Sequence, residues 1–159
     1  MKAKKTIALV AHDSQKPDMI EWVEENWATL MKYDIVCTGT TGTLVEQALK
    51  TYLPKEDFDV QKIKKLKSGP LGGDQQLGAM IADTKVDMLI FFWDPMQAQP
   101  HDVDVKALLR ITTLYNIPTA LNRSSADFII TSSLMGQSYT PVIKDYSAYI
   151  NRSITIERA

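Results

Sequence analysis

The hydrophobic residues of this chain form short unbroken runs that alternate with segments of helical spacing. Four runs contain β-branched or aromatic residues and predict strands: Ile7–Ala11, Asp34–Thr38, Val86–Trp93 and Thr119–Leu121. Five segments carry apolar residues three or four positions apart and predict amphipathic helices: 17–31, 44–49, 77–81, 105–112 and 125–130. Strand and helix therefore follow one another along most of the chain.

Two segments fit this pattern less well. Residues 53–67 are rich in lysine, fit neither the helical nor the strand period, and are interpreted as a loop that leads into a solvated edge strand. The tail from Asp145 to Arg152 predicts a final short helix. Repeated strand–helix units in 159 residues predict a single α/β domain, residues 1–159, with an open, mainly parallel five-stranded sheet flanked by helices.

Composition narrows the function classes. The chain has 18 lysines and arginines against 19 aspartates and glutamates, a net charge of −1, without the basic excess that is typical of nucleic-acid binding. The longest unbroken apolar run, Met88–Trp93, is far shorter than a membrane span. The apolar run near the N-terminus is too short for a signal peptide, and the single cysteine, Cys37, excludes an internal disulfide. We therefore expect a cytoplasmic protein with no nucleic-acid and no membrane partner.

Polar residues gather directly after the predicted strands. His12–Lys16 follow the strand Ile7–Ala11, and Thr38–Gly42 follow the strand that begins at Asp34. Ser68–Asp74 follow the edge strand expected within 53–67, and Asp94–Asp104 follow the strand Val86–Trp93. In open α/β sheets, ligands bind beyond the carboxyl ends of the strands. We expect these four groups to share one rim and to form the functional site.

The Thr38–Gly42 turn combines hydroxyl groups with backbone N–H groups at a helix start, a setting that favours an anion such as phosphate. Ser68, Gly69 and Lys16 would add donors and a positive charge on the same rim. The chain contains neither a Walker A nor a G-x-G-x-x-G motif, so a nucleotide is poorly supported. Alternatively, threonine and serine only cap helices and glycine only makes turns. The residues alone leave both interpretations open.

Asp74 lies at a helix start, where it is either a plain N-cap or a functional carboxylate. The expected rim also holds three further carboxylates and both histidines: Asp94, Asp102, Asp104, His12 and His101. Crowded carboxylates raise at least one pKa, and a nearby histidine can donate or relay a proton, so the set suits acid–base chemistry on a small phosphorylated molecule. The same groups could bind a divalent metal, but no H-x-x-x-H spacing supports this, and we predict no metal and no cofactor.

Five blocks of sequence resemble the methylglyoxal synthase family. They are Ile7–Asp13, Thr38–Gly42, Ser68–Gln76, Phe91–Pro95 and Pro100–Arg110, in the family's order. The chain departs from the family pattern in the lysine-rich segment near residues 50–66, and after residue 131 it resembles the family only loosely.

This resemblance implies an enzyme that converts dihydroxyacetone phosphate to methylglyoxal and inorganic phosphate without a cofactor, on a Rossmann-like fold and as a homo-hexamer. Carried over by motif, Asp74 would be the catalytic base, His101 would donate to the enediolate oxygen, and Asp104 would assist proton transfer. The implied substrate-binding residues are His12, Lys16, Thr38, Gly39, Thr40, Thr41, Ser68, Gly69 and His101. Arg152 would reach the site of a neighbouring subunit. Inorganic phosphate, the product, is an expected inhibitor.

Two other functions compete with this one. A regulatory phosphate-binding domain of the same fold could keep the threonine–glycine turn, but it would not need Asp74, His101 and Asp104 together. A metal-dependent phosphohydrolase with an aspartate nucleophile would lose its activity in a chelator. The joint presence of the three residues favours the lyase.

Overall fold

The computed structural model describes residues 1, 4–53 and 63–152. Its strands and helices alternate in this order: β1 (Thr6–Ala11), η1 (Asp13–Gln15), α1 (Lys16–Glu25), α2 (Trp27–Leu30), β2 (Asp34–Cys37), α3 (Gly39–Lys50), β3 (Lys64–Lys65), η2 (Gly69–Leu71), α5 (Gly73–Ala82), β4 (Met88–Phe92), α6 (Asp102–Leu114), β5 (Thr119–Ala120), α7 (Arg123–Ile130) and α8 (Ser147–Ile150). Here η1 and η2 are single turns of 3₁₀-helix.

The five strands form one parallel sheet in the order β3-β2-β1-β4-β5. β1 lies at the centre and pairs with β2 from Thr6 to Leu9 and with β4 from Ile7 to Ala11. The predicted five-stranded α/β sheet is therefore confirmed. Because every strand runs in the same direction, the loops that follow the strands meet at one edge.

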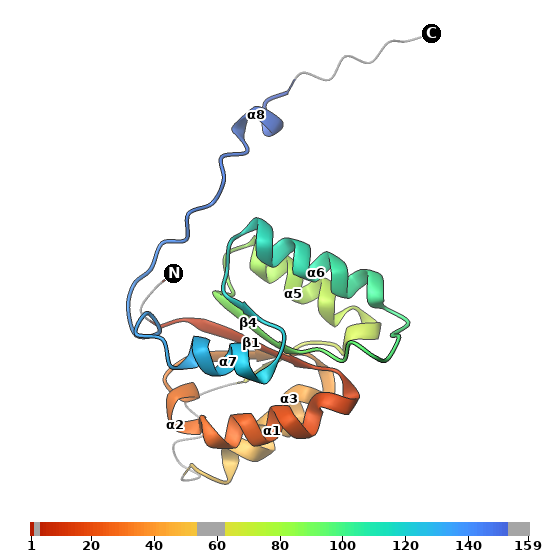
Figure 1. Cartoon of the computed structure of the whole chain (residues 1–159), viewed down its shortest axis with the longest axis vertical. Helices are drawn as coiled ribbons and strands as arrows, with labels where there is room; N and C mark the ends of the chain where they lie inside the picture. Colours follow the sequence, from red (N-terminus) through yellow and green to blue (C-terminus); the bar gives the residue numbers. More distant parts are fainter. Residues whose placement is uncertain (2–3, 54–62, 153–159) are drawn as a thin grey trace.

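Helices cover both faces of the sheet, with α1, α3 and α7 on one face and α5 and α6 on the other (Figure 1). The central strand, β1, contributes side chains to the hydrophobic core on each face of the sheet, because successive side chains of a strand point to opposite faces. Ile7 and Leu9 pack into the core under the first face, and Ala8 and Val10 pack into the core under the second. This double burial explains why the first and fourth strands appear as continuous apolar runs.

Some boundaries differ from those expected. The helix expected over 17–31 is two helices, because the backbone leaves the helical region at Asn26, whose side-chain amide donates to the Trp22 carbonyl oxygen at 2.9 Å. The segment expected as a turn at Thr38–Gly42 is already helical from Gly39 onward. The edge strand is confirmed at Lys64–Lys65, and the rest of that prediction, over residues 54–62, lies outside the described residues.

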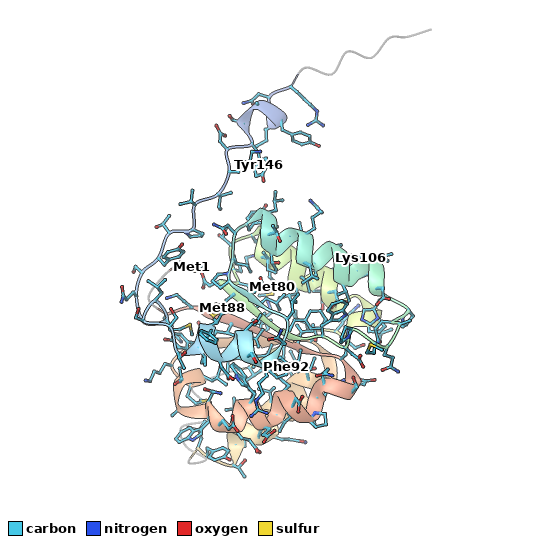
Figure 2. The ribbon with its side chains drawn as sticks, in the orientation of Figure 1. Met1, Met80, Met88, Phe92, Lys106 and Tyr146 are labelled. Carbon is cyan, nitrogen blue, oxygen red and sulfur yellow. The ribbon has the colours of Figure 1, made fainter. Side chains whose placement is uncertain are left out.

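After α7 the chain leaves the layered body as an extended segment, residues 140–152, which we call the C-terminal arm (Figure 1). Figure 2 shows Tyr146 on this arm, far from the core residues Met88 and Phe92. The chain just before the arm is held by Lys5, which is 2% exposed and donates to the carbonyl oxygens of Met135 at 2.7 Å and Gln137 at 2.6 Å. Of the helices in the described ranges, none is both long and apolar enough to span a membrane.

Candidate active site

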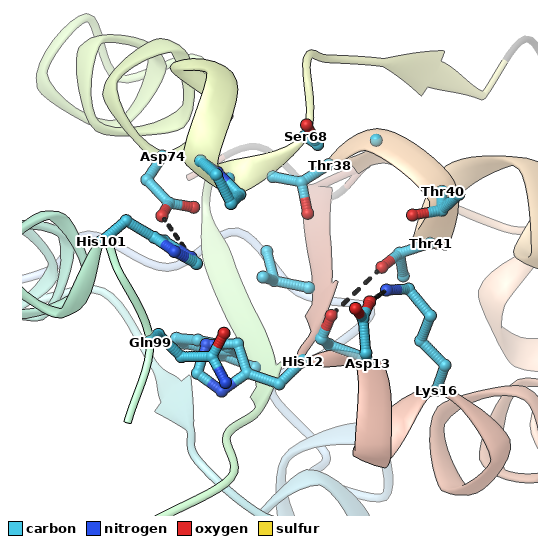
Figure 3. Close-up of a pocket in the computed structure, with 16 residues that line it drawn as sticks. His12, Asp13, Lys16, Thr38, Thr40, Thr41, Ser68, Asp74, Gln99 and His101 are labelled. Carbon is cyan, nitrogen blue, oxygen red and sulfur yellow. Dashed lines mark hydrogen bonds and ion pairs between the residues drawn. The ribbon is translucent and has the colours of Figure 1, made fainter. Parts of the chain in front are cut away.

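A cavity of about 260 Å³ opens at the edge where the strands end, between the loops that follow β1, β2, β3 and β4 (Figure 3). Ten of the twelve predicted site residues line it: His12, Lys16, Thr38, Gly39, Thr40, Thr41, Ser68, Gly69, Asp74 and His101. The structure therefore brings together residues that lie up to 89 positions apart in the chain, from His12 to His101. The parallel topology is the physical reason for this grouping.

Glycine lets the loops after β2 and β3 approach each other closely. The Gly39 N–H donates to the carbonyl oxygens of Leu66 at 3.1 Å and Lys67 at 3.0 Å. Gly39 has a positive φ of 37°, and a Cβ atom there would lie only 2.6 Å from the Ser68 Cα. At Gly73, a Cβ atom would lie 2.1 Å from the Lys67 carbonyl oxygen. Larger residues at these two positions would separate the loops.

One wall of the cavity is suited to an anion. Thr38, Thr40 and Thr41 stand at the N-terminus of α3, a helix of 12 residues. Lys16 lines the same wall with a side chain only 16% exposed, and its ammonium group forms an ion pair with Asp13 (Figure 3). The helix dipole, the hydroxyl groups and this cation together favour a phosphate group.

The opposite wall carries a buried acid–base pair. The Asp74 side chain, in the first turn of α5, is 4% exposed, and its Oδ2 lies 3.6 Å from the His101 Nε2 (Figure 3). Among the described residues this oxygen has no hydrogen-bond partner. Burial raises the pKa of Asp74, the negative charge of Asp104 raises it further, and His101 opposes the rise. A carboxylate in this state is a stronger base than an exposed aspartate.

Gly69 allows the loop before α5 to pack directly on this pair. A Cβ atom at Gly69 would lie 2.9 Å from the His101 Nε2 and 3.1 Å from the Asp74 Oδ2. The absence of a side chain at this position leaves the two groups facing each other at the cavity wall.

His12 lies between the two walls at the end of β1. Its Nδ1 accepts a hydrogen bond from the Asp94 backbone N–H at 3.1 Å, while its Nε2 is buried and has no partner among the described residues. The ring packs edge-on against Phe91, with centroids 5.0 Å apart, and against His101, with centroids 5.9 Å apart. Burial lowers the pKa of His12, and His101 lowers it further, so the imidazole is neutral over most of the physiological pH range.

Two predicted residues do not line the cavity. Asp104, in the first turn of α6, lines a separate groove between α5 and α6, which it shares with Asp74. It therefore acts on Asp74 through its charge and not as part of the cavity wall. Arg152 is on the C-terminal arm, where its guanidinium lies 3.6 Å from the centre of the Tyr149 ring, and it does not contribute to the cavity of its own chain.

The expectation of crowded carboxylates is wrong for Asp94, which does not line the cavity. Its side chain accepts hydrogen bonds from Ser14 and from two backbone N–H groups, and the bond from Ser14 is the largest cause of its lowered pKa. The raised pKa of Asp74 arises chiefly from burial and only secondarily from a neighbouring charge.

The cavity also contains residues that the sequence did not single out. Pro70 and Gln99 line it; they lie within the Ser68–Asp74 and Asp94–Asp104 segments, but neither was assigned a role, because neither side chain carries a charge or can act as an acid or base near neutral pH. In the parts of the chain that the structure describes, no group of three or more histidine, cysteine, aspartate or glutamate residues could hold a metal ion. Cys37 is buried in β2, and burial raises the pKa of its thiol to about 12, which makes it inert.

Comparison with known proteins gives consistent results. The family model described as the MGS-like domain matches residues 18–121. A protein named methylglyoxal synthase from Maridesulfovibrio salexigens is 50% identical over 157 residues, covering 97% of this chain and 100% of the relative. One of the same name from Coxiella burnetii is 47% identical over 150 residues, covering 94% of this chain and 98% of the relative. The crystal structure of methylglyoxal synthase from Elizabethkingia anophelis matches with a TM-score of 0.86 at 46% identity, covering 98% of this chain and 95% of that one.

Proposed function

The chain belongs to the methylglyoxal synthase family, and on that basis we propose that it converts dihydroxyacetone phosphate to methylglyoxal and inorganic phosphate through an enediolate. The observation that carries this proposal is the position of the buried Asp74 carboxylate, 3.6 Å from His101, opposite an anion-binding wall in one cavity. A three-carbon phosphate ester that spans the cavity would place its phosphate at one wall and its carbonyl group at the other.

The first step is a proton transfer from carbon. Asp74 takes a proton from the hydroxymethyl carbon next to the carbonyl group, and the electron pair of the C–H bond moves onto the carbonyl oxygen as an enediolate. The raised pKa of Asp74 makes the carboxylate a better base. His101, held against Asp74, can hydrogen-bond to an oxygen of the enediolate. Asp104 assists the transfer by keeping the proton affinity of Asp74 high.

The second step is the loss of phosphate. The hydroxyl group of the enediolate first passes its proton to the former carbonyl oxygen. The electron pair left on the hydroxyl oxygen then forms the aldehyde C=O bond, the C=C pair shifts towards the carbon that bears the phosphate, and the phosphate leaves with the electron pair of its C–O bond. The resulting enol takes up a proton at its terminal carbon and loses its hydroxyl proton to become methylglyoxal. Lys16, Ser68, the threonines at the start of α3 and the dipole of that helix stabilise the negative charge that builds on the departing oxygen.

The decisive experiment incubates the purified protein with dihydroxyacetone phosphate and measures both products. We expect methylglyoxal and phosphate in equal amounts, with the rate unchanged by a metal chelator. Binding of the substrate without turnover would instead support a regulatory domain. Phosphate release that is abolished by the chelator and yields no methylglyoxal would support a metal-dependent phosphohydrolase.

Inorganic phosphate is proposed as an inhibitor, because the product fits the same anion-binding wall as the phosphate group of the substrate. We expect added phosphate to raise the KM for dihydroxyacetone phosphate. No change in KM at high phosphate concentration would contradict the placement of the phosphate at this wall.

We also propose that the chain forms a homo-hexamer in which Arg152 enters the site of a neighbouring subunit. The C-terminal arm supports this, since it leaves the body of its own chain with Val142 and Ile150 exposed at 83% and 74%. Light scattering measures the oligomeric state, and a monomer at micromolar concentration would overturn the proposal.

Mixed oligomers test the shared site. Asp74→Asn and Arg152→Ala subunits are each expected to be inactive alone. If each site combines Asp74 of one chain with Arg152 of another, random equimolar mixing restores about a quarter of the wild-type activity. Recovery of none would place both residues in the same chain's site, and an Arg152→Ala protein that is active alone would remove Arg152 from the site. Lys144→Ala, which removes another cation from the same arm, is the control and is expected to stay active alone.

A further inference from the structure

We propose that Ser14 and Asp94 are positioning residues that hold His12 as the neutral Nε2–H tautomer, so that His12 donates a hydrogen bond to the substrate. Neither residue lines the cavity. The identity of the substrate rests on the proposed function, whereas the state of the imidazole rests on the contacts of His12 alone.

The backbone contact of His12 defines its tautomer. A backbone N–H can only donate, so the His12 Nδ1 that accepts from Asp94 at 3.1 Å must carry a lone pair. In the neutral ring the proton is then on Nε2. This second nitrogen is buried and has no partner among the described residues, so its donor is free for a ligand in the cavity that His12 lines.

The loop that supplies this N–H is fixed by the Asp94 side chain. The Asp94 Oδ2 accepts from the Ser14 hydroxyl at 2.5 Å, and the Oδ1 accepts from the backbone N–H groups of Met96 at 2.9 Å and Gln97 at 3.2 Å. Ser14 belongs to η1, which follows β1, and Asp94 follows β4. The hydrogen bond from Ser14 to Asp94 therefore joins the ends of two adjacent strands and holds the Asp94 N–H against the imidazole.

The same contact opposes protonation of the ring. An imidazolium would place a second N–H group at Nδ1, directly facing the N–H of Asp94. The charged or titratable groups that act on His12 are His101 and Lys16, which disfavour a positive charge, and Asp94 and Asp102, which favour it. Burial of the ring also disfavours the positive charge. The backbone contact and the burial of the ring therefore both favour a neutral donor.

The two histidines have different contacts and therefore different roles in the proposed reaction. His101 faces the Asp74 carboxylate through its Nε2, at 3.6 Å, whereas the His12 Nε2 has no carboxylate against it. With the ring centroids 5.9 Å apart, both imidazoles can reach the three-carbon part of one small substrate. We infer that His12 donates to an oxygen of that part and stabilises the charge that develops there.

The chain offers a direct readout, since it contains only two histidines. Protein without a histidine tag is labelled with ¹⁵N-histidine, and His101→Gln leaves His12 as the single imidazole to be assigned. We expect a pyridine-type Nδ1 and a pyrrole-type Nε2 for His12 throughout the range from pH 7 to pH 8. A pyrrole-type Nδ1, a rapidly exchanging mixture or an imidazolium at the acid end would overturn the proposal.

Variants of Ser14 and Asp94 test whether these two residues position His12. Asp94→Ala and Ser14→Ala should convert the His12 signal to a mixture of tautomers and lower kcat by about tenfold or more, with a smaller change in KM. The matched control is Asp83→Ala, which removes an exposed carboxylate that pairs with Lys85 at the end of α5. It should change neither the spectrum nor kcat.

The outcomes separate this inference from the proposed function. An unchanged His12 spectrum in folded Asp94→Ala protein refutes the positioning role even if the wild type makes methylglyoxal. The expected spectra in a protein without turnover would leave the tautomer inference standing and refute the proposed reaction.

Discussion

Replacing Asp74 by asparagine should make the protein more stable and nearly inactive. The substitution keeps the shape of the side chain but removes its negative charge, its basicity and its need for solvation. Asp74 is 4% exposed, and its Oδ2 has no hydrogen-bond partner within the described ranges; its ionic contact with the His101 Nε2 is longer than a hydrogen bond, at 3.6 Å. The fold therefore holds this charged carboxylate at a cost in stability.

The magnitude follows from that burial. Leaving a buried polar group unsatisfied costs about 1–3 kcal/mol, and an asparagine amide recovers part of it, so we expect a gain of about 1–2 kcal/mol. For a chain of this size, each kcal/mol corresponds to about 2–4 °C in Tm, which gives a rise of about 2–8 °C. Loss of a general base lowers kcat by about 10² to 10⁴.

The gain in stability should depend on pH in a defined direction. Burial raises the pKa of Asp74 above its ordinary value of 3.8, so the folded protein binds this proton more tightly than the unfolded chain does. The full difference between Asp74→Asn and wild type is therefore present at neutral pH, above the raised pKa. It shrinks as the pH falls through the raised pKa towards 3.8, because the wild-type carboxyl group becomes neutral as well.

Urea denaturation at several pH values, together with steady-state kinetics, measures both effects on the same samples. Asp83→Asn is the control, since its exposed side chain should change stability by no more than about 0.5 kcal/mol. A lower stability of Asp74→Asn at neutral pH would refute the argument from burial. Turnover above a tenth of the wild-type value would mean that another group is the base.

Three further outcomes can be measured with the same assays. Gly73→Ala should lower the free energy of unfolding by about 1–3 kcal/mol, because its Cβ would clash with a carbonyl oxygen 2.1 Å away. Gly78→Ala in the same helix has open space around its Cβ and should raise the free energy of unfolding by about 0.5–1 kcal/mol. Equal effects in urea denaturation would contradict the close loop contact. Lys16→Met should raise the KM for dihydroxyacetone phosphate about tenfold or more, and substitution of the exposed Lys64 by methionine is the control that should leave the KM unchanged. An unchanged KM in Lys16→Met would remove Lys16 from the anion-binding wall. Lys5→Met leaves two carbonyl oxygens without their donor and should lower stability by about 1–3 kcal/mol in thermal denaturation; wild-type stability would argue against Lys5 as the anchor of the segment before the arm.

Sequence patterns predicted the parts of the fold that depend on local order. A strand buried on both faces has to be apolar throughout, so β1 and β4 appear as continuous runs. The rule that ligands bind where parallel strands end placed ten of the predicted site residues on one rim, and the structure brings these ten together around one cavity. The break at Asn26 and the early start of α3 were missed, because the apolar spacing continues across the first and the glycines of Thr38–Gly42 suggested a turn.

The properties of the site were decided by contacts between distant segments. The raised pKa of Asp74 depends on how completely α5, α6 and the loop at Gly69 exclude water around it, which no local pattern records. The free Nε2 of His12 depends on a backbone N–H that lies 82 residues further along the chain. The identities of Asp74, His12 and His101 were thus readable from the sequence. The protonation states of Asp74 and His12 required the tertiary structure, because desolvation and hydrogen bonding depend on every element packed around a group.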